Sequence, residues 1–218
     1  MLPIEYPFVS SSELHLGAND SITRDESFFH QGDPIMAYEL ETRRALLRNI
    51  TLDDAQEYYD QIWSQPDVMR YLPGGAPRVR EQTETYINYF SNHWATHGFG
   101  LWGVVIKETS KFVGHCGIQI IQETQEIEVA YAFGKDYWGQ GLGSETAHAS
   151  LRFGFEELGL ERIIAIAVPE NMASRRIMEK NGMKYQGEKR MVGFDLSYYV
   201  LMRHEFVPNN EPYLLRKL

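Results

Sequence analysis

Alternation between two kinds of side chain is clearest over residues 127–133, and this period of two predicts a strand with two distinguishable faces. One face carries Ile127, Val129, Tyr131 and Phe133, and the other carries Glu128, Ala130 and Ala132. Apolar positions then recur at helical spacing over residues 142–158, and Gly159 suits the left-handed residue that ends a helix. Residues 162–168 are nearly all apolar and rich in β-branched side chains, which predicts a buried parallel strand. The middle of the chain is therefore a β-loop-α-β unit.

The flanking regions predict further strands and two helices. A strand is predicted over residues 38–48, followed by a helix from Leu52, where Thr51 and Asp54 make a capping-box-like pair. Prolines and glycines mark a loop over residues 66–77. The apolar face of a second helix is formed by Tyr86, Ile87, Phe90 and Trp94. Further strands are predicted near residues 101–107 and 112–121 and over 194–206, which leaves 208–218 as a tail.

Three alternating glycines, Gly139, Gly141 and Gly143, lie where the predicted strand ends and the predicted helix begins. Glycines keep side chains away from an approaching anion, and the first turn of a helix presents unpaired N–H groups at the positive end of its dipole. The loop lacks the Gly-Lys-Ser/Thr of a nucleoside triphosphate site, and Ser144 and Thr146 stand where a dinucleotide fingerprint needs glycine. A hydrolase elbow centred on Ser144 would also need glycine in place of Thr146. Among phosphate-containing ligands, the sequence therefore favours a pyrophosphate that belongs to a molecule other than NAD or ATP.

Composition limits the class of protein. The chain of 218 residues is 43% hydrophobic, which is enough for a full core, and one domain is the default. The net charge of −9 argues against general nucleic-acid binding and mildly favours cationic substrates such as amines. No apolar run reaches the roughly 18 residues of a membrane span, and no secretory leader pattern opens the sequence. The single cysteine, Cys116, fits a reducing compartment, so we expect a cytoplasmic protein without membrane or nucleic-acid partners.

Three segments resemble the GNAT superfamily of acetyl-CoA-dependent N-acetyltransferases: the glycine loop, Asn171-Met172-Ala173-Ser174 and Glu179-Lys180-Asn181-Gly182-Met183. More narrowly, Trp138-Gly139 and Ser144-Glu145 are similar to the RimJ/RimL-like branch, the ribosomal-protein N-terminal acetyltransferases and their relatives. The resemblance covers residues 38–206. It implies an α/β (α+β) fold with a mixed, mostly antiparallel twisted sheet of about six to seven strands, a central parallel pair and about four flanking helices. The organisation of the sequence divides the chain into an N-terminal arm rich in Ser, Asp and Gly (1–36), the acetyltransferase domain (37–206) and a C-terminal tail (207–218).

The resemblance also implies where acetyl-CoA binds. In this family, backbone N–H groups of the central strand polarise the thioester carbonyl and pair with the pantetheine amides, and the glycine loop binds the pyrophosphate. The backbone residues so implied are Val129, Ala130, Tyr131, Ala132, Phe133, Trp138, Gly139, Gln140, Gly141, Leu142, Gly143 and Ser144. The Asn171 side chain is expected at the pantetheine. No metal is expected, because His93 and His97 have the spacing of a metal pair but lack an obvious third ligand.

Two residues are candidates for proton transfer. Alternation places Glu128 close to the expected thioester, where partial burial would raise its pKa and suit it to act as general base. The alternative for Glu128 is a solvated charge near a turn, in the company of Glu123 and Glu126. Ser174 is the expected proton donor to the sulfur, because Met178 stands where many GNAT enzymes carry a tyrosine. Asn171 and Ser174 could equally be an ordinary helix cap.

The reaction implied by the resemblance is direct attack of a primary amine on acetyl-CoA in a ternary complex, without an acetyl-enzyme. The acceptor is expected to be a protein or peptide N-terminus, and a small-molecule amine is the alternative. A catalytically silent acyl-CoA-binding sensor is the alternative from another class, because a fold alone does not establish activity. The arm and the tail also allow a homodimer.

Overall fold

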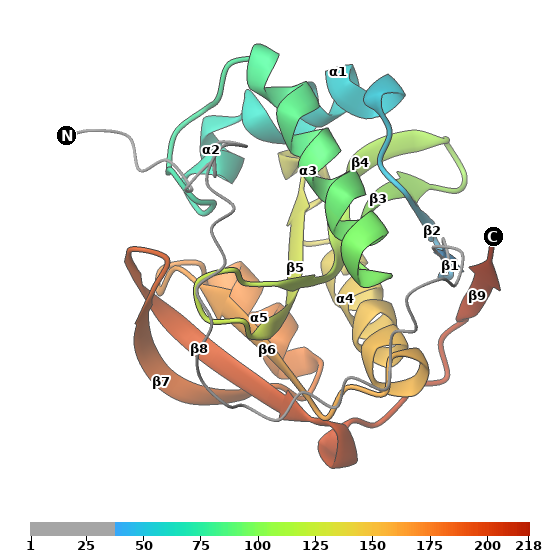
Figure 1. Cartoon of the computed structure of the whole chain (residues 1–218), viewed down its shortest axis with the longest axis vertical. Helices are drawn as coiled ribbons and strands as arrows, with labels where there is room; N and C mark the ends of the chain where they lie inside the picture. Colours follow the sequence, from blue (N-terminus) through green and yellow to red (C-terminus); the bar gives the residue numbers. More distant parts are fainter. Residues whose placement is uncertain (1–37) are drawn as a thin grey trace.

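The computed structural model describes residues 38–218, which form one nine-stranded sheet (Figure 1). The strand order is β7-β8-β6-β5-β4-β3-β2-β1-β9. The strands are β1 (Tyr38–Glu41), β2 (Ala45–Arg48), β3 (Leu101–Ile106), β4 (Lys111–Ile120), β5 (Ile127–Phe133), β6 (Arg162–Ala167), β7 (Lys184–Met191), β8 (Phe194–Met202) and β9 (Leu214–Lys217). The predicted N-terminal arm, residues 1–36, lies outside the described residues.

The described residues contain five α-helices, and some of their ends carry recognisable sequence signals. They are α1 (Ala55–Tyr58), α2 (Pro66–Met69), α3 (Glu81–His97), α4 (Leu142–Arg152) and α5 (Met172–Lys180). The backbone N–H of Thr51 donates to Asp54 Oδ2 at 2.8 Å, so the expected capping pair is present just before α1. Pro66 begins α2 inside the predicted loop, because proline is tolerated in the first turn of a helix. Gly98 ends α3 in the left-handed conformation (φ 71°).

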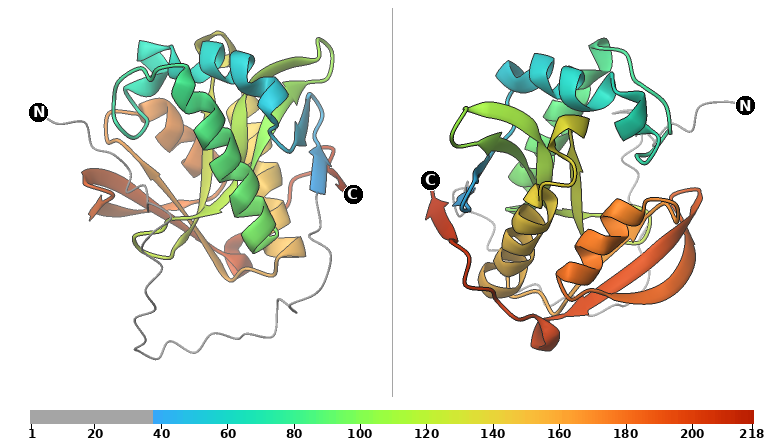
Figure 2. Two further views of the ribbon diagram at one scale, coloured as in Figure 1. Left: turned by 45° about the horizontal axis from the view of Figure 1, so that its top comes forward. Right: turned by 180° about the vertical axis from the view of Figure 1, so that it is seen from behind.

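Different helices cover the two faces of the sheet (Figure 2). Adjacent residues of β4 point to opposite faces, so they report which helix lies on each side. Cys116 Sγ lies 3.4 Å from Ser150 Oγ of α4, whereas His115 Nδ1 lies 2.9 Å from Tyr58 Oη of α1. The Phe90 ring of α3 packs beside Tyr58, with centroids 6.0 Å apart. Helices α1 and α3 therefore cover one face, and α4 and α5 lie side by side on the other.

The parallel pair at the centre of the sheet consists of β5 and β6, which α4 connects. Strand β5 pairs with β4 along its whole length. In contrast, it registers with β6 at only one position, Glu128 opposite Ile164. The expected mixed, mostly antiparallel sheet with a central parallel pair is confirmed, and the two parallel strands part directly after this pair.

The expected number of about six to seven strands is wrong, because the sheet has nine. The predicted strand 38–48 is divided by a turn in which Thr42 Oγ1 accepts a hydrogen bond from the Ala45 N–H at 3.0 Å. Strand β7 was not predicted because nearly all of its side chains are exposed, which removes the alternating pattern. Strand β9 lies in the predicted tail and pairs antiparallel with β1 at one edge of the sheet. The predicted strand 194–206 ends at Met202.

Candidate active site

One edge of β5 is available to a ligand. Residues 129–133 use their other edge to pair with β4, and past Glu128 and Ile164 they have no registered partner in β6 (Figure 1). Backbone N–H and C=O groups along a strand edge need hydrogen-bond partners when they are buried. An extended ligand with amide groups can supply these partners by adding as a further strand.

The loop after β5 presents open backbone. Gly139 (φ 72°) and Gly141 (φ 79°) are both left-handed, which favours glycine, and α4 begins at Leu142. A Cβ added at Gly139 would meet no atom within 4 Å, and one at Gly141 would meet only Arg44 Nη2 at 3.6 Å. The first turn of α4 contributes N–H groups that have no helical acceptor. Open glycine backbone beside a helix N-terminus fits a ligand that carries phosphate groups.

Gly143 and Trp138 have structural explanations that need no ligand. A Cβ at Gly143 would lie 2.8 Å from Ile177 Cδ1, so this glycine lets α5 pack closely against α4. Trp138 Nε1 donates to the Phe133 carbonyl at 2.8 Å and so ties the loop to the end of β5. Trp138 as a whole is 37% exposed, so it lies at the surface of the loop. In this loop, Gly139 and Gly141 present open backbone, whereas Trp138 and Gly143 are fixed by packing and hydrogen bonding.

Glu128 lies at the point where β5 and β6 part, and it is only 8% exposed. Gln119 Nε2 donates to Glu128 Oε1 at 2.6 Å across the β4–β5 pair. Burial raises the pKa of Glu128 to about 7, although the hydrogen bond from Gln119 acts in the opposite direction. Burial and then the Glu128 charge also raise the pKa of Tyr89 on α3, so this helix faces the carboxylate. A carboxylate with a pKa near neutrality can accept a proton at physiological pH.

The neighbouring Glu126 is an ordinary ion-paired carboxylate. It accepts a hydrogen bond from Arg162 Nη1 at 2.8 Å, and its hydrogen bonds to Tyr198 and Arg162 outweigh its desolvation and lower its pKa. The alternative of a solvated charge therefore does not describe Glu128, which is buried without a cation partner in its hydrogen bonds. Strand alternation explains the side on which Glu128 lies, but Gln119 comes from another strand and gave no local sequence signal.

Ser174 is brought to β5 by the helix cap and by Tyr131. Asn171 Oδ1 accepts from the Ser174 N–H at 3.1 Å, so Asn171 is the N-cap of α5. Tyr131 Oη lies 3.0 Å from Ser174 Oγ and donates to the Ser174 carbonyl at 3.1 Å. Met178, which stands where many GNAT enzymes carry a tyrosine, is 2% exposed and belongs to the core. The sequence predicts a role only for the backbone of Tyr131. The contact of its hydroxyl with Ser174 follows from the position of α5.

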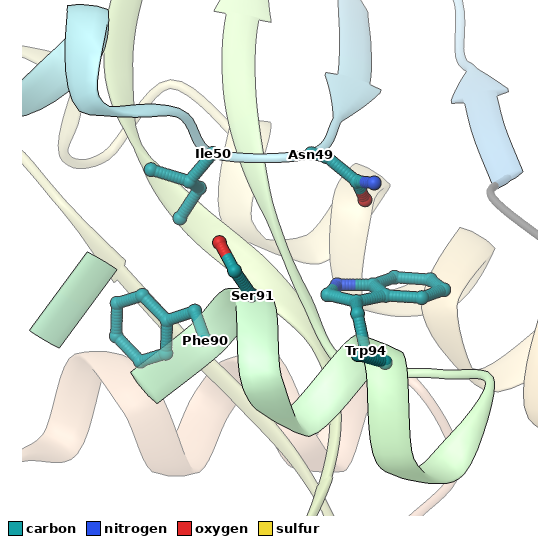
Figure 3. Close-up of a pocket in the computed structure, with 6 residues that line it drawn as sticks. Asn49, Ile50, Phe90, Ser91 and Trp94 are labelled. Atoms are coloured by element: carbon teal, nitrogen blue, oxygen red, sulfur yellow. The ribbon is translucent and has the colours of Figure 1, made fainter. Parts of the chain in front are cut away.

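The remaining candidates lie outside this arrangement. His93 Nδ1 lies 2.8 Å from the Phe99 carbonyl, and Nε2 accepts from the Ile120 N–H at 3.2 Å, so both ring nitrogens are engaged. Within residues 38–218 no group of three or more His, Cys, Asp and Glu side chains could hold a metal ion. A cavity of about 140 Å³ lies beside α3 and shares no residue with the predicted site (Figure 3). It is lined by Asn49, Ile50, Phe90, Ser91, Trp94 and Ala95.

Comparison with known proteins identifies the family. The model of the "Acetyltransferase (GNAT) domain" family matches residues 44–184. The chain belongs to the GNAT family. It is 34% identical to "Uncharacterized protein YkkB" of Bacillus subtilis, over 67% of this chain and 86% of YkkB. It is 30% identical to "Uncharacterized N-acetyltransferase YnaD" of the same species, over 76% of this chain and 97% of YnaD. The crystal structure of a GNAT-family acetyltransferase from Bacillus anthracis matches with a TM-score of 0.67 and 28% identity, over 77% of this chain and 99% of that chain.

Membership of the GNAT family makes this chain an N-acetyltransferase, and therefore an acyltransferase. Proteins of this fold use acetyl-CoA and act on amine acceptors. In the part of the chain that the structure describes, no helix is both long enough and apolar enough to cross a membrane. In this GNAT domain the open glycine loop connects the free edge of β5 to the start of α4.

The raised pKa of Glu128 predicts a gain in stability when its charge is removed. A folded-state pKa of about 7, above the ordinary 4.5, means that stability falls as pH rises from 4.5 through 7. Glu128→Gln should therefore increase the free energy of unfolding by up to about 3 kcal/mol at pH 8 and by little at pH 4. Urea unfolding at both pH values measures this difference. Glu126→Gln is the control, and it should destabilise the protein at pH 8 because its pKa is lowered. A loss of stability in Glu128→Gln at pH 8 would contradict the assignment.

Proposed function

We propose that this GNAT protein transfers the acetyl group of acetyl-CoA to the amino group of a protein or peptide N-terminus, by direct attack in a ternary complex. The observation that carries this proposal is the buried Glu128 carboxylate beside the free edge of β5. Its pKa of about 7 suits a general base at neutral pH. The same carboxylate argues against a silent acyl-CoA sensor, which would have no use for a buried charge without a cation partner.

The donor would be held by residues whose geometry suits it. Backbone groups of residues 129–133 would pair with pantetheine amides, and the open loop around Gly139 and Gly141 would take the pyrophosphate. Acetyl-CoA supplies the acetyl group as a thioester. The Asn171 side-chain oxygen already accepts the Ser174 N–H, so its amide nitrogen is the group left to reach the pantetheine.

Two side chains would handle the protons. Glu128 would accept a proton from the attacking amine, and Ser174 Oγ would supply one to the departing sulfur. The two hydrogen bonds between Tyr131 and Ser174 hold the serine at β5, so it needs no reorganisation to stay beside the strand. Because Val129 and Tyr131 alternate with Glu128, the base and the proton donor act from opposite sides of one strand.

The pKa of Glu128 favours an α-amino acceptor. An α-amino group titrates near 7.7–8.0, so its proton passes to a base of pKa about 7 at a cost of roughly 1 kcal/mol. A lysine-type ammonium titrates near 10.4, and the same transfer costs roughly 5 kcal/mol. The ribosomal-protein-S5-alanine acetyltransferase of Vibrio fischeri has this fold, with a TM-score of 0.63 at 18% identity. We further propose that the chain is of the RimJ/RimL-like type indicated by Trp138-Gly139 and Ser144-Glu145, acts in the cytoplasm and forms a homodimer.

A small-molecule amine is the second candidate acceptor. The chain is 27% identical to the "FsC-acetyl coenzyme A-N(2)-transacetylase" of Aspergillus fumigatus, over 60% of this chain and 58% of that protein. The name of that relative describes acetyl transfer from acetyl coenzyme A to a nitrogen, N(2), of FsC, and it names no protein acceptor. The pH argument from Glu128 weighs against strongly basic polyamines in particular.

Release of free CoA from acetyl-CoA, followed with a thiol reagent, tests the proposed function. The acceptors compared are short peptides with a free N-terminus, the same peptides with a blocked N-terminus, amino acids and polyamines. We expect release with the free peptides and none with the blocked ones. Turnover on small amines alone would establish the second candidate, and binding of acetyl-CoA without turnover on any acceptor would favour the sensor.

The pH dependence of turnover tests the role of Glu128. At saturating substrates, kcat should rise with pH through about 7 as the carboxylate ionises. Glu128→Gln should lower kcat by about 100-fold or more and remove this rise, while the affinity for acetyl-CoA stays within about twofold. Gln119→Leu removes the hydrogen bond that favours the charged form, so the rise should move to higher pH.

Ser174→Ala is the matched control for that profile, because it should lower kcat without moving the rise near pH 7. An unchanged kcat across pH in Glu128→Gln would remove Glu128 from the mechanism. Full activity of Ser174→Ala would remove the serine.

A further inference from the structure

Glu145 presents an electrostatic problem for a phosphate site. It lies in the first turn of α4, four residues after Gly141, where a free carboxylate would repel an anionic ligand. Its side chain is only 8% exposed and points to the turn between β1 and β2. Oε1 accepts from Thr42 Oγ1 at 2.7 Å and from the Arg44 N–H at 2.9 Å, and Oε2 accepts from Arg44 Nε at 2.7 Å. The charge is therefore paired and turned away from the open side of the loop.

The Arg44 side chain contacts both the Glu145 carboxylate and the glycine loop. Its Nη1 donates to the Gln140 carbonyl at 2.8 Å, while its Nε holds Glu145. One planar guanidinium therefore joins the first turn of α4 to the peptide that precedes Gly141. Lysine lacks this fixed geometry, because its ammonium is a compact charge on a flexible stem and has no planar fork of donors.

The contact to Gln140 fixes the orientation of one peptide group. In a planar trans peptide the carbonyl of one residue and the N–H of the next point in opposite directions. With the Gln140 carbonyl held by Arg44, the N–H of Gly141 points away from Arg44. Glycine on both sides of Gln140 would otherwise allow this peptide to rotate, because glycine populates left- and right-handed conformations with similar ease.

We propose that Arg44 and Glu145 form a clamp that holds the Gln140–Gly141 peptide with its N–H available to the pyrophosphate of the donor. Arg44 and Glu145 are positioning residues and need not touch the ligand. The turn between β1 and β2 thereby contributes to donor affinity, although it lies about 100 residues earlier in the chain. The identity of the ligand rests on the proposed function, but the clamp itself rests on the hydrogen bonds above.

Calorimetric titration with CoA, in the absence of any acceptor, tests the clamp in the full chain. Arg44→Lys keeps the charge and loses the bridge, so we expect the affinity for CoA to fall about tenfold or more. Glu145→Gln gives opposite expectations for two models. If Glu145 only repelled phosphate, its removal would strengthen binding, whereas loss of the clamp weakens it. Arg43→Met is the control, because Arg43 is 60% exposed and its contact to Glu211 is 3.7 Å long.

Amide hydrogen exchange of the same variants supplies a readout that does not depend on the ligand. Faster exchange at residues 139–144 in Arg44→Lys, with an unchanged melting temperature and weaker CoA binding, would support the clamp. Unchanged CoA affinity in Arg44→Lys, or tighter binding by Glu145→Gln, would overturn it. Wild-type protein that binds no CoA would overturn the proposed function and with it the ligand part of the clamp. If the wild-type protein binds CoA and only Arg44→Lys and Glu145→Gln bind it more weakly, the result supports the clamp and agrees with the proposed function.

Discussion

Strands β5 and β6 share a single registered pair, Glu128 with Ile164, and the arrangement of the site follows from their separation beyond it. Sheet pairing normally satisfies backbone groups on both edges of a central strand. Here residues 129–133 are paired with β4 alone, so a strand in the middle of the sheet has a free edge. Helix α4 connects the two strands, and its N-terminus therefore lies at the end of that edge. A ligand that follows β5 arrives directly at the glycine loop.

The same strand separates two chemical environments. On one side Tyr131 reaches Ser174 at the start of α5, and on the other Glu128 faces Gln119 and α3. The carboxylate is unfavourable for stability when it is ionised, because burial outweighs its one hydrogen bond. A destabilising carboxylate of this kind is expected where proton transfer is needed for activity, because active sites often lower the stability of the fold. Glu145 is the contrasting case of a carboxylate with a structural role. Its hydrogen bonds with Thr42 and Arg44 outweigh its burial and lower its pKa.

Local sequence patterns predict the elements around the site, but they do not predict contacts between distant segments. Alternation identified β5 and the face of Glu128, and the glycines identified the loop, because each of these features is a property of consecutive residues. Gln119, Arg44 and the Tyr131 hydroxyl could not be assigned from the sequence. Their partners depend on the register between two strands, on a turn about 100 residues away, and on the position of α5 against β5. Strand β9 gives no recognisable sequence pattern, because it has only four residues and lies at the edge of the sheet.

Chemical-shift mapping of backbone amides during titration with CoA measures directly whether one ligand occupies both the free edge and the loop. We expect the largest changes at residues 129–133 and 139–144, and small ones in β2, β3 and α3. Large changes around the cavity beside α3, with residues 129–133 unaffected, would contradict the assignment of β5 as the donor-binding strand.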